Sequence, residues 1–384
     1  MYLINLLFLP AILFIGAITS YEDFTISKIR NKWVILGLLY PVFCYSFLYL
    51  LVFVKLIDYG GVNHAYIISK LINTAIGIVV AYGIWKFGAW SAGDAKLFIA
   101  YTVLIPLDFY SKGYIKFFPS LILLFNIYIP LLTAITLTAL FKLLSLGFLI
   151  IKDKEKRIEL VNSSVKILKN VKVKAKKAYS KGGILILVYL AVFLALESAV
   201  RTLSLPKIII VPILLLIQPL SDLIRKNKTL LILCSVGVIS YFVFKFSHGY
   251  TLPEFLPFLK RMLKIFSLFG LVKIILFLYI KCTQIRKIEV DKLRAGEVIA
   301  EDALTADDPQ LASEEFKKGL GQLYPEGLTC EQTEFIRSFC LNSGIRFIEV
   351  YKTFPFALWV FIGVIITLIF RQSVIGVAIT LFSY

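Results

Sequence analysis

The chain has 384 residues, of which 59% are hydrophobic and only 17% are charged, and its mean hydropathy is +0.84. Soluble domains average about 25% charged residues, so this composition excludes a soluble globular protein and predicts a polytopic membrane protein. The formal net charge is +18. Because the basic residues gather in loops between apolar runs, they predict cytoplasmic loops and give no reason to expect a nucleic-acid partner.

The amino-terminal apolar runs predict a group of spanning helices. Residues 2–19 are long enough for one bilayer crossing. They lack the basic start and the cleavage site of a signal peptide, so we expect a retained helix. Lys28, Arg30 and Lys32 follow, which predicts that this loop is cytoplasmic. Further spans are expected at 33–54, 66–86, 95–107 and 119–151.

The middle of the chain combines a basic segment with more apolar runs. Residues 152–182 contain 11 Lys and Arg against 3 acids, the strongest cytoplasmic signal in the chain. A helix there would suit anionic lipid headgroups, so membrane lipid is an expected partner. Other apolar runs lie at 183–200, 207–221, 229–247, 265–281 and 355–382. Ten spans with an external amino terminus place every basic loop in the cytoplasm. Because the runs at 207–221 and 265–281 are short or flanked by basic residues, we expect about 8–10 transmembrane helices.

Residues 283–354 are the only part of the chain with the composition of a soluble domain. They hold 13 acids and 9 bases, against 11 acids and 33 bases elsewhere. Short strands are expected at 298–299 and 346–350, and residues 329–332 fit a capping box that opens a helix ending near Gly344. The expected fold is therefore an all-α polytopic membrane protein with a small α+β domain, which the span count places in the cytosol.

Two aspartates stand at ends of apolar runs, 71 positions apart: Asp23 after the first run and Asp94 before the fourth. An unpaired carboxylate in a membrane costs several kcal/mol and commonly marks function. Both lie on the predicted cytoplasmic side, so we expect them to meet as an aspartyl protease dyad in which one carboxyl stays protonated. Each aspartate could instead cap a helix end, and that alternative stays open. Because adjacent helical side chains point apart, either Asp23 or its neighbour Glu22 should face solvent.

Other acids favour other roles. Glu197 has Arg201 four residues later, which predicts an ion pair along one helix. Asp222 lies close to basic residues. Asp58 and Asp108 are expected on the external side of the membrane, away from the two candidate aspartates. Two histidines and five cysteines without C-x-x-C spacing predict neither a metal site nor a disulfide framework.

At the aspartates the chain resembles the archaeal type IV prepilin and preflagellin peptidases, the G-x-G-D family of membrane aspartyl proteases. Asp23 with Ile29 and Asn31 is similar to the family's Asp…Ile-Pro-Asn loop, with Arg30 in place of Pro. Residues 92–97, Ala-Gly-Asp-Ala-Lys-Leu, are similar to the family's G-A-G-D-A-K-L, whose first glycine is replaced by a serine.

A third similarity is that of residues 290–302, 327–329 and 354–356 to the carboxy-terminal domain of the archaeal branch. The resemblance covers roughly residues 1–145 and 283–384. It implies an aspartic endopeptidase, without metal or organic cofactor, that removes the short basic leader from pilin or archaellin precursors at the cytoplasmic face. It assigns roles to Asp23 and Asp94 as the catalytic pair, and to Gly93, Lys96 and Asn31 as support for the motif or for substrate binding.

These expectations divide the chain into a membrane catalytic core (1–151), a basic loop (152–182), additional transmembrane helices (183–282), a small cytosolic domain (283–354) and a carboxy-terminal transmembrane helix (355–384). Two other functions remain open. A transporter or channel would use Asp23, Asp94 and Glu197 to bind cations or relay protons. A pilus-assembly subunit would keep the fold without activity. The sequence predicts no particular oligomeric state.

Overall fold

The structure, a computed structural model, describes the amino-terminal and carboxy-terminal parts of the chain most fully. The described residues are 2–55, 63–86, 90–111, 115–152, 190–191, 194, 227–247, scattered positions between 256 and 275, 279–300, 313–321, 327–352 and 355–382. The expected features that lie wholly or largely outside them are the basic segment 152–182, the spans at 183–200, 207–221 and 265–281, the Glu197–Arg201 pair, Asp58 and Asp222.

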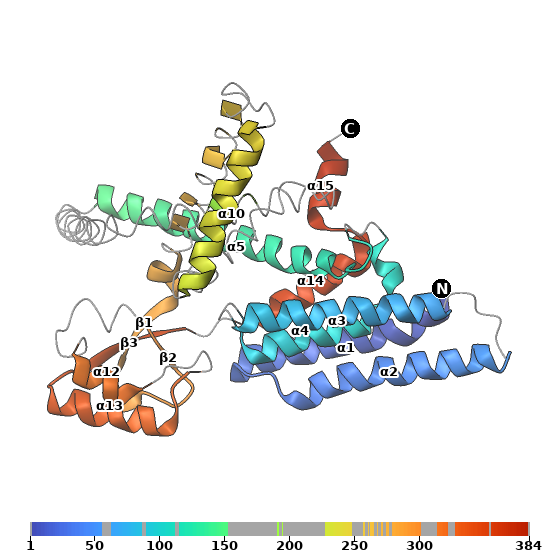
Figure 1. Ribbon diagram of the computed structural model, residues 1–384. Coiled ribbons are helices and arrows are strands. Elements are labelled where there is room, and N and C mark those ends of the chain that lie inside the picture. Colours follow the sequence, from blue (N-terminus) through green and yellow to red (C-terminus); the bar gives the residue numbers. More distant parts are fainter. Residues whose placement is uncertain are drawn as a thin grey trace. The chain divides into compact units, whose positions relative to one another are not determined.

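Long apolar helices dominate the described residues (Figure 1). Four of them can cross a membrane by length and composition: α1 (Tyr2–Ile26), α2 (Asn31–Phe53), α3 (His64–Lys86) and α5 (Leu121–Lys152). A bent pair, α14 (Phe356–Phe370) and α15 (Val374–Phe382), makes a fifth crossing if it is counted as one span. These helices support a multi-pass membrane protein.

The chain divides into two compact units. One contains residues 1–133 and 279–384, and the other contains residues 134–278. In the second unit the span expected at 229–247 is present as α10 (Lys228–Ser247), an apolar helix shorter than the four above. Val238 of this helix belongs to a small buried cluster with Leu194.

The apolar run expected to span at 95–107 forms a helix of the same length that begins three residues earlier. Helix α4 (Ala92–Leu104) has 13 residues, which is about 20 Å at 1.5 Å per residue, so this helix alone does not cross a hydrocarbon core of about 30 Å. It ends because Ile105 precedes Pro106 and takes an extended conformation, after which the 3-10 helix η1 (Leu107–Tyr110) follows. Helix α4 packs against α2, α3 and α14.

Two polar side chains of α3 donate hydrogen bonds to backbone carbonyls at the carboxy-terminal end of α4. The Lys70 ammonium donates to the Ile105 carbonyl, and Asn73 Nδ2 donates to the Thr102 carbonyl at 3.5 Å. Both side chains are buried. A helix that ends inside an apolar environment needs such donors, since water is not there to bind its last carbonyls.

The final span expected at 355–382 is also wrong as a single helix, because it breaks after Phe370 and bends by 47°. Arg371 adopts a left-handed conformation (φ 53°) at the end of α14. Asn126 of α5 holds the break: its Nδ2 donates to the Gln372 carbonyl at 3.1 Å, and its Oδ1 accepts from the Val374 N–H at 2.8 Å.

Two glycines let α14 lie close to its neighbours. A Cβ on Gly16 of α1 would stand 2.0 Å from the Phe361 ring, and a Cβ on Gly363 would stand 2.5 Å from Ile127 Cγ1 of α5. Both distances are far below van der Waals contact. The middle of α14 is therefore packed tightly against α1 and α5.

The carboxy-terminal soluble segment folds around a three-stranded antiparallel sheet in the order β1-β3-β2. The strands expected at 298–299 and 346–350 are confirmed as β2 (Val298–Ile299) and β3 (Phe347–Tyr351). Strand β1 (Ile285–Glu289) and helix α12 (Glu314–Leu320) were not predicted. Short η3 (Ile280–Gln284) and η4 (Val290–Lys292) flank β1.

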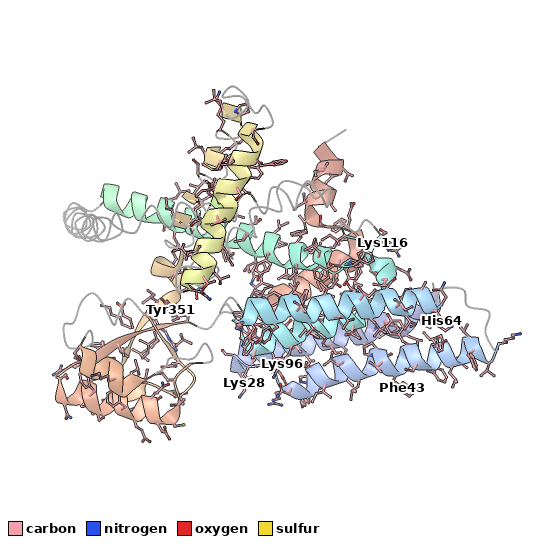
Figure 2. The ribbon with its side chains drawn as sticks, in the orientation of Figure 1. Lys28, Phe43, His64, Lys96, Lys116 and Tyr351 are labelled. Carbon is pink, nitrogen blue, oxygen red and sulfur yellow. The ribbon has the colours of Figure 1, made fainter. Side chains whose placement is uncertain are left out.

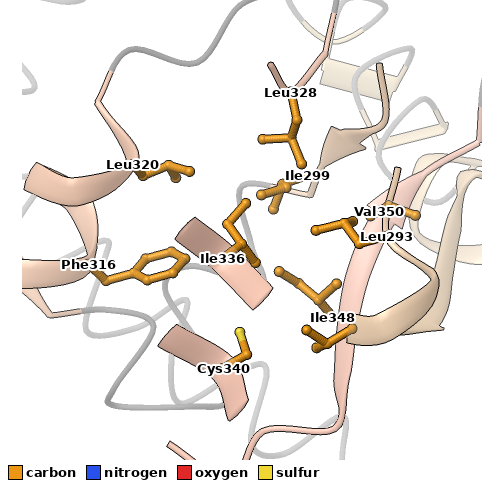
Figure 3. Packing of buried hydrophobic residues seen from close by; sticks show 10 residues of the cluster. Leu293, Ile299, Phe316, Leu320, Leu328, Ile336, Cys340, Ile348 and Val350 are labelled. Carbon is orange, nitrogen blue, oxygen red and sulfur yellow. The ribbon is translucent and has the colours of Figure 1, made fainter. Parts of the chain in front are cut away.

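The capping box of this domain is confirmed. Thr329 Oγ1 accepts from the Gln332 N–H, and Gln332 Oε1 accepts from the Thr329 N–H, at the start of α13 (Cys330–Asn342). Gly344 follows the helix at φ 70°, a conformation that glycine adopts without strain. Ten buried side chains from the strands, both helices and their loops form the core, among them Ile336, Ile348 and Val350 (Figure 3).

Candidate active site

The two predicted aspartates lie at the same end of helices α1–α4. Figure 2 shows Lys28 and Lys96 at this end and His64 and Lys116 at the opposite end. Asp23 stands three residues before the end of α1, and Asp94 is the third residue of α4.

Asp23 is bound to the first turn of α14. Its Oδ2 accepts from the Ala357 N–H at 2.8 Å. This N–H has no partner within the helix, and the positive end of the helix dipole favours a carboxylate there. Helix α1 ends just beyond, because Ser27 turns the chain at φ 53° and donates its N–H to the Asp23 carbonyl at 3.0 Å.

Asp94 is held by Ser91 at the start of α4. Ser91 Oγ donates to Asp94 Oδ2 at 2.7 Å and accepts from the Asp94 N–H at 3.2 Å, and the Ser91 N–H donates to the same carboxylate at 3.3 Å. This is a capping box with aspartate in the third position. Asp94 is 8% exposed. The spacing of Ser91 to Asp94 in the sequence is the signal that indicates this cap.

The structure brings the two carboxylates within electrostatic reach of each other. Asp94 precedes the apolar run of α4, and burial raises its pKa to about 6; the Ser91 hydrogen bonds oppose this rise, and the negative charge of Asp23 adds to it. Two carboxyl groups coupled in this way resist ionising together. The pair can therefore hold one proton near neutral pH.

Each residue that binds one of the two carboxylates follows an aromatic residue in the sequence, and the two aromatic rings are in contact. Trp90 precedes Ser91, Phe356 precedes Ala357, and the Trp90 and Phe356 rings are 5.8 Å apart. Thus α14, which begins more than 250 residues after α4 ends, contributes to the site. No sequence motif indicated this contribution.

Glu22 is buried and does not join the aspartates, whereas Asp23 is half-buried, so the prediction that one of the adjacent acids faces solvent is met only in part. Glu22 is 7% exposed. Its carboxylate accepts from Trp33 Nε1 at 2.8 Å and from the Arg30 N–H at 3.2 Å. It therefore fastens the end of α1 to the start of α2, while Asp23 points to α14.

Two supporting residues predicted from the motifs contact each other. Lys96 Nζ donates to Asn31 Oδ1 at 3.3 Å. Ile29 is buried in the same loop, and its Cβ lies 3.7 Å from the position that a Cβ on Gly93 would take. The Asp23 loop thus packs on the first turn of α4.

Gly93, the third supporting residue, has space for a side chain. Its backbone is not in the left-handed region, and an added Cβ would meet Ile29 and Ser91 at ordinary contact distances of 3.6–3.7 Å. Neither unusual backbone geometry nor a close helix approach requires glycine at this position. Across the described residues, no group of three or more His, Cys, Asp or Glu side chains could hold a metal ion.

Comparisons of this chain with protein-family models, with curated proteins and with solved structures found no match.

Proposed function

We propose that the chain is a membrane aspartic endopeptidase that removes the short basic leader from type IV pilin-like or archaellin precursors. The observation that carries the proposal is that Asp23 and the buried Asp94 lie at one end of the helices, where the charge of Asp23 acts on the Asp94 carboxyl. An aspartic protease needs two carboxyl groups that share a proton near neutral pH, and burial with mutual repulsion supplies that condition.

In the proposed reaction the pair acts as one acid–base unit. The ionised carboxylate takes a proton from a water molecule, which attacks the scissile carbonyl carbon. The protonated carboxyl donates to the carbonyl oxygen, and proton return to the departing amine completes the cleavage. Because the two groups titrate together, neither role is assigned to Asp23 or to Asp94 alone.

The proposed orientation puts this end of the helices in the cytoplasm. Lys28, Arg30 and Lys32 in the Asp23 loop are the basic residues that mark a cytoplasmic loop. A precursor would place its apolar helix among the spans and its basic leader at the carboxylates. With this orientation, the proposal has about 8–10 spans and a cytosolic 283–354 domain.

One observation favours a second function, an inactive membrane subunit of pilus assembly. Both carboxylates bind the first turns of helices, Asp94 in α4 and Asp23 in α14. Helix capping alone would account for these contacts without any catalysis. Cleavage measurements separate the two functions.

The test is cleavage of candidate pilin or archaellin precursors by the full chain, followed as leader removal on a gel. Asp23→Asn and Asp94→Asn should each lower the rate by at least about 100-fold, as expected for the loss of acid–base groups. Membrane fractions should contain both variants at the normal level.

Glu22→Gln is the matched control, because it replaces the neighbouring acid by its amide and keeps an oxygen to accept from Trp33. It should retain cleavage. Full processing by either aspartate variant would refute the catalytic dyad and favour the inactive subunit, in which both carboxylates only cap helices.

A further inference from the structure

Two buried polar atoms near the carboxylates have no hydrogen-bond partner among the described residues: Trp90 Nε1 and the Tyr128 hydroxyl. Trp90 is only 3% exposed. An unpaired buried donor costs about 1–3 kcal/mol, so its presence in a folded protein calls for an explanation.

Both atoms belong to an aromatic cluster that borders the site, formed by Trp90, Tyr128 and Phe356. The Trp90 and Tyr128 rings are stacked, with centroids 5.9 Å apart and planes at 8°. Phe356 contacts both, at 5.8 Å and 6.5 Å. The cluster is next to the groups that bind both aspartates, since Ser91 follows Trp90 and Ala357 follows Phe356. The charge of Asp94 also acts on the Tyr128 hydroxyl.

Two other tyrosines in the first unit are paired, whereas the buried Tyr101 hydroxyl has no hydrogen-bond partner among the described residues and lies outside this aromatic cluster. The Tyr110 hydroxyl accepts from Ser120 Oγ at 3.3 Å, and the Tyr40 hydroxyl donates to the Leu7 carbonyl at 2.7 Å. These contacts stabilise the fold. The Tyr128 hydroxyl makes no such contact in the described part of the chain, so a purely structural role does not explain it.

We infer that Trp90 and Tyr128 are substrate-positioning residues whose N–H and O–H groups donate to backbone carbonyls of an extended precursor segment at the scissile bond. An indole N–H only donates, and a phenol O–H donates readily, so the matching ligand group is an acceptor. Carbonyls of a helical substrate are already bonded, whereas those of an extended segment are free. The substrate would have to be unwound where it is cut, and the flat rings would contact its side chains.

This inference rests on the proposed endopeptidase function. The test is steady-state cleavage by the full chain in detergent, using a precursor that the unchanged protein processes. Tyr128→Phe keeps the ring stack and removes one donor. Its KM should rise about fivefold with kcat nearly unchanged, as for a hydrogen bond made equally in the bound and transition states. The melting temperature should stay the same or rise, because an unpaired hydroxyl is removed.

Tyr110→Phe is the matched control, because it removes a paired hydroxyl in the same unit. It should lower the melting temperature and leave KM unchanged. If Tyr128→Phe has the KM of the unchanged protein, or loses stability as Tyr110→Phe does, the inference is overturned while the proposed function stands. If the unchanged protein cleaves no precursor, the proposed function is overturned and the inference with it.

Discussion

Ser91 is the residue that most directly sets the state of Asp94. It stands where the resembled family has glycine, and its hydroxyl both donates to the Asp94 carboxylate and accepts from the Asp94 N–H. Hydrogen bonds to the ionised form lower a carboxyl pKa, and these oppose the rise that burial causes. The serine thus partly replaces the solvation that Asp94 loses.

Ser91→Gly, which removes the hydroxyl, should raise the pKa of Asp94 above its value of about 6. A carboxyl with a raised pKa ionises only at higher pH, and the coupled pair shares the shift. The pH profile of kcat/KM for precursor cleavage should therefore move to higher pH, with activity lost first on the acid side.

Ser91→Thr is the control, since it keeps the hydroxyl and should keep the profile. A profile that stays in place or moves to lower pH in Ser91→Gly would contradict this account. Loss of the serine cap to glycine should also lower stability by roughly a few tenths of a kcal/mol, so the measurements belong at a temperature where both variants are folded.

At the scale of elements, α14 links the site to the rest of the first unit. Its first turn binds Asp23, its middle packs on α1 and α5 through Gly16 and Gly363, and its end is held by Asn126. A displacement of this helix would move the Ala357 N–H away from the carboxylate. Stability and cleavage should therefore depend on the same packing.

Gly363→Ala should destabilise the protein by about 1–3 kcal/mol, the usual cost of overpacking. The added Cβ would lie 2.5 Å from Ile127 Cγ1 and 2.9 Å from the Ile127 backbone nitrogen, and backbone cannot move aside cheaply. The melting temperature in detergent measures the effect, and precursor cleavage should fall with it.

Gly83→Ala provides the comparison. Gly83 lies in α3, and a Cβ there meets nothing within 4 Å. Since alanine favours helix more than glycine, this variant should be neutral or slightly stabilising. Equal melting temperatures for the two variants would refute the packing argument for α14.

At the scale of the molecule, the two ends of helices α1–α4 in the first unit carry different polar residues. The carboxylates lie at the end marked by Lys28 and Lys96, and His64 and Lys116 mark the other end (Figure 2). Basic residues flank the carboxylates, which predicts that this end faces the cytoplasm. The orientation can be tested without any substrate.

Single cysteines at exposed positions 28 and 116, in a chain whose native cysteines are replaced, report the orientation. A membrane-impermeant maleimide applied to intact cells should label Lys116→Cys and spare Lys28→Cys until the cells are permeabilised. The reverse pattern would place the carboxylates outside and exclude access to a cytoplasmic leader.

Local patterns in the sequence determined several elements. Apolar runs of about 20 residues predicted α1, α2, α3 and α5, because a helix that satisfies its own backbone is what such a run can form in a membrane. The spacing of Thr329 and Gln332 predicted the start of α13, since capping involves only neighbouring residues. The Asp23 and Asp94 motifs identified the candidate carboxylates.

Contacts distant in sequence were decided only by the tertiary structure. It supplied hydrogen-bond donors from α3 to the end of α4, broke the final span at a position held by Asn126, and turned Glu22 toward α2 and Asp23 toward Ala357. It also gathered Trp90, Tyr128 and Phe356 beside the carboxylates. Periodicity and spacing report which residues are apolar and which are neighbours along one helix. They do not report which helix supplies the hydrogen-bond partner of a buried group, because that depends on packing between different helices, whose contacting residues are 11 positions apart for Glu22 and Trp33 and 334 apart for Asp23 and Ala357.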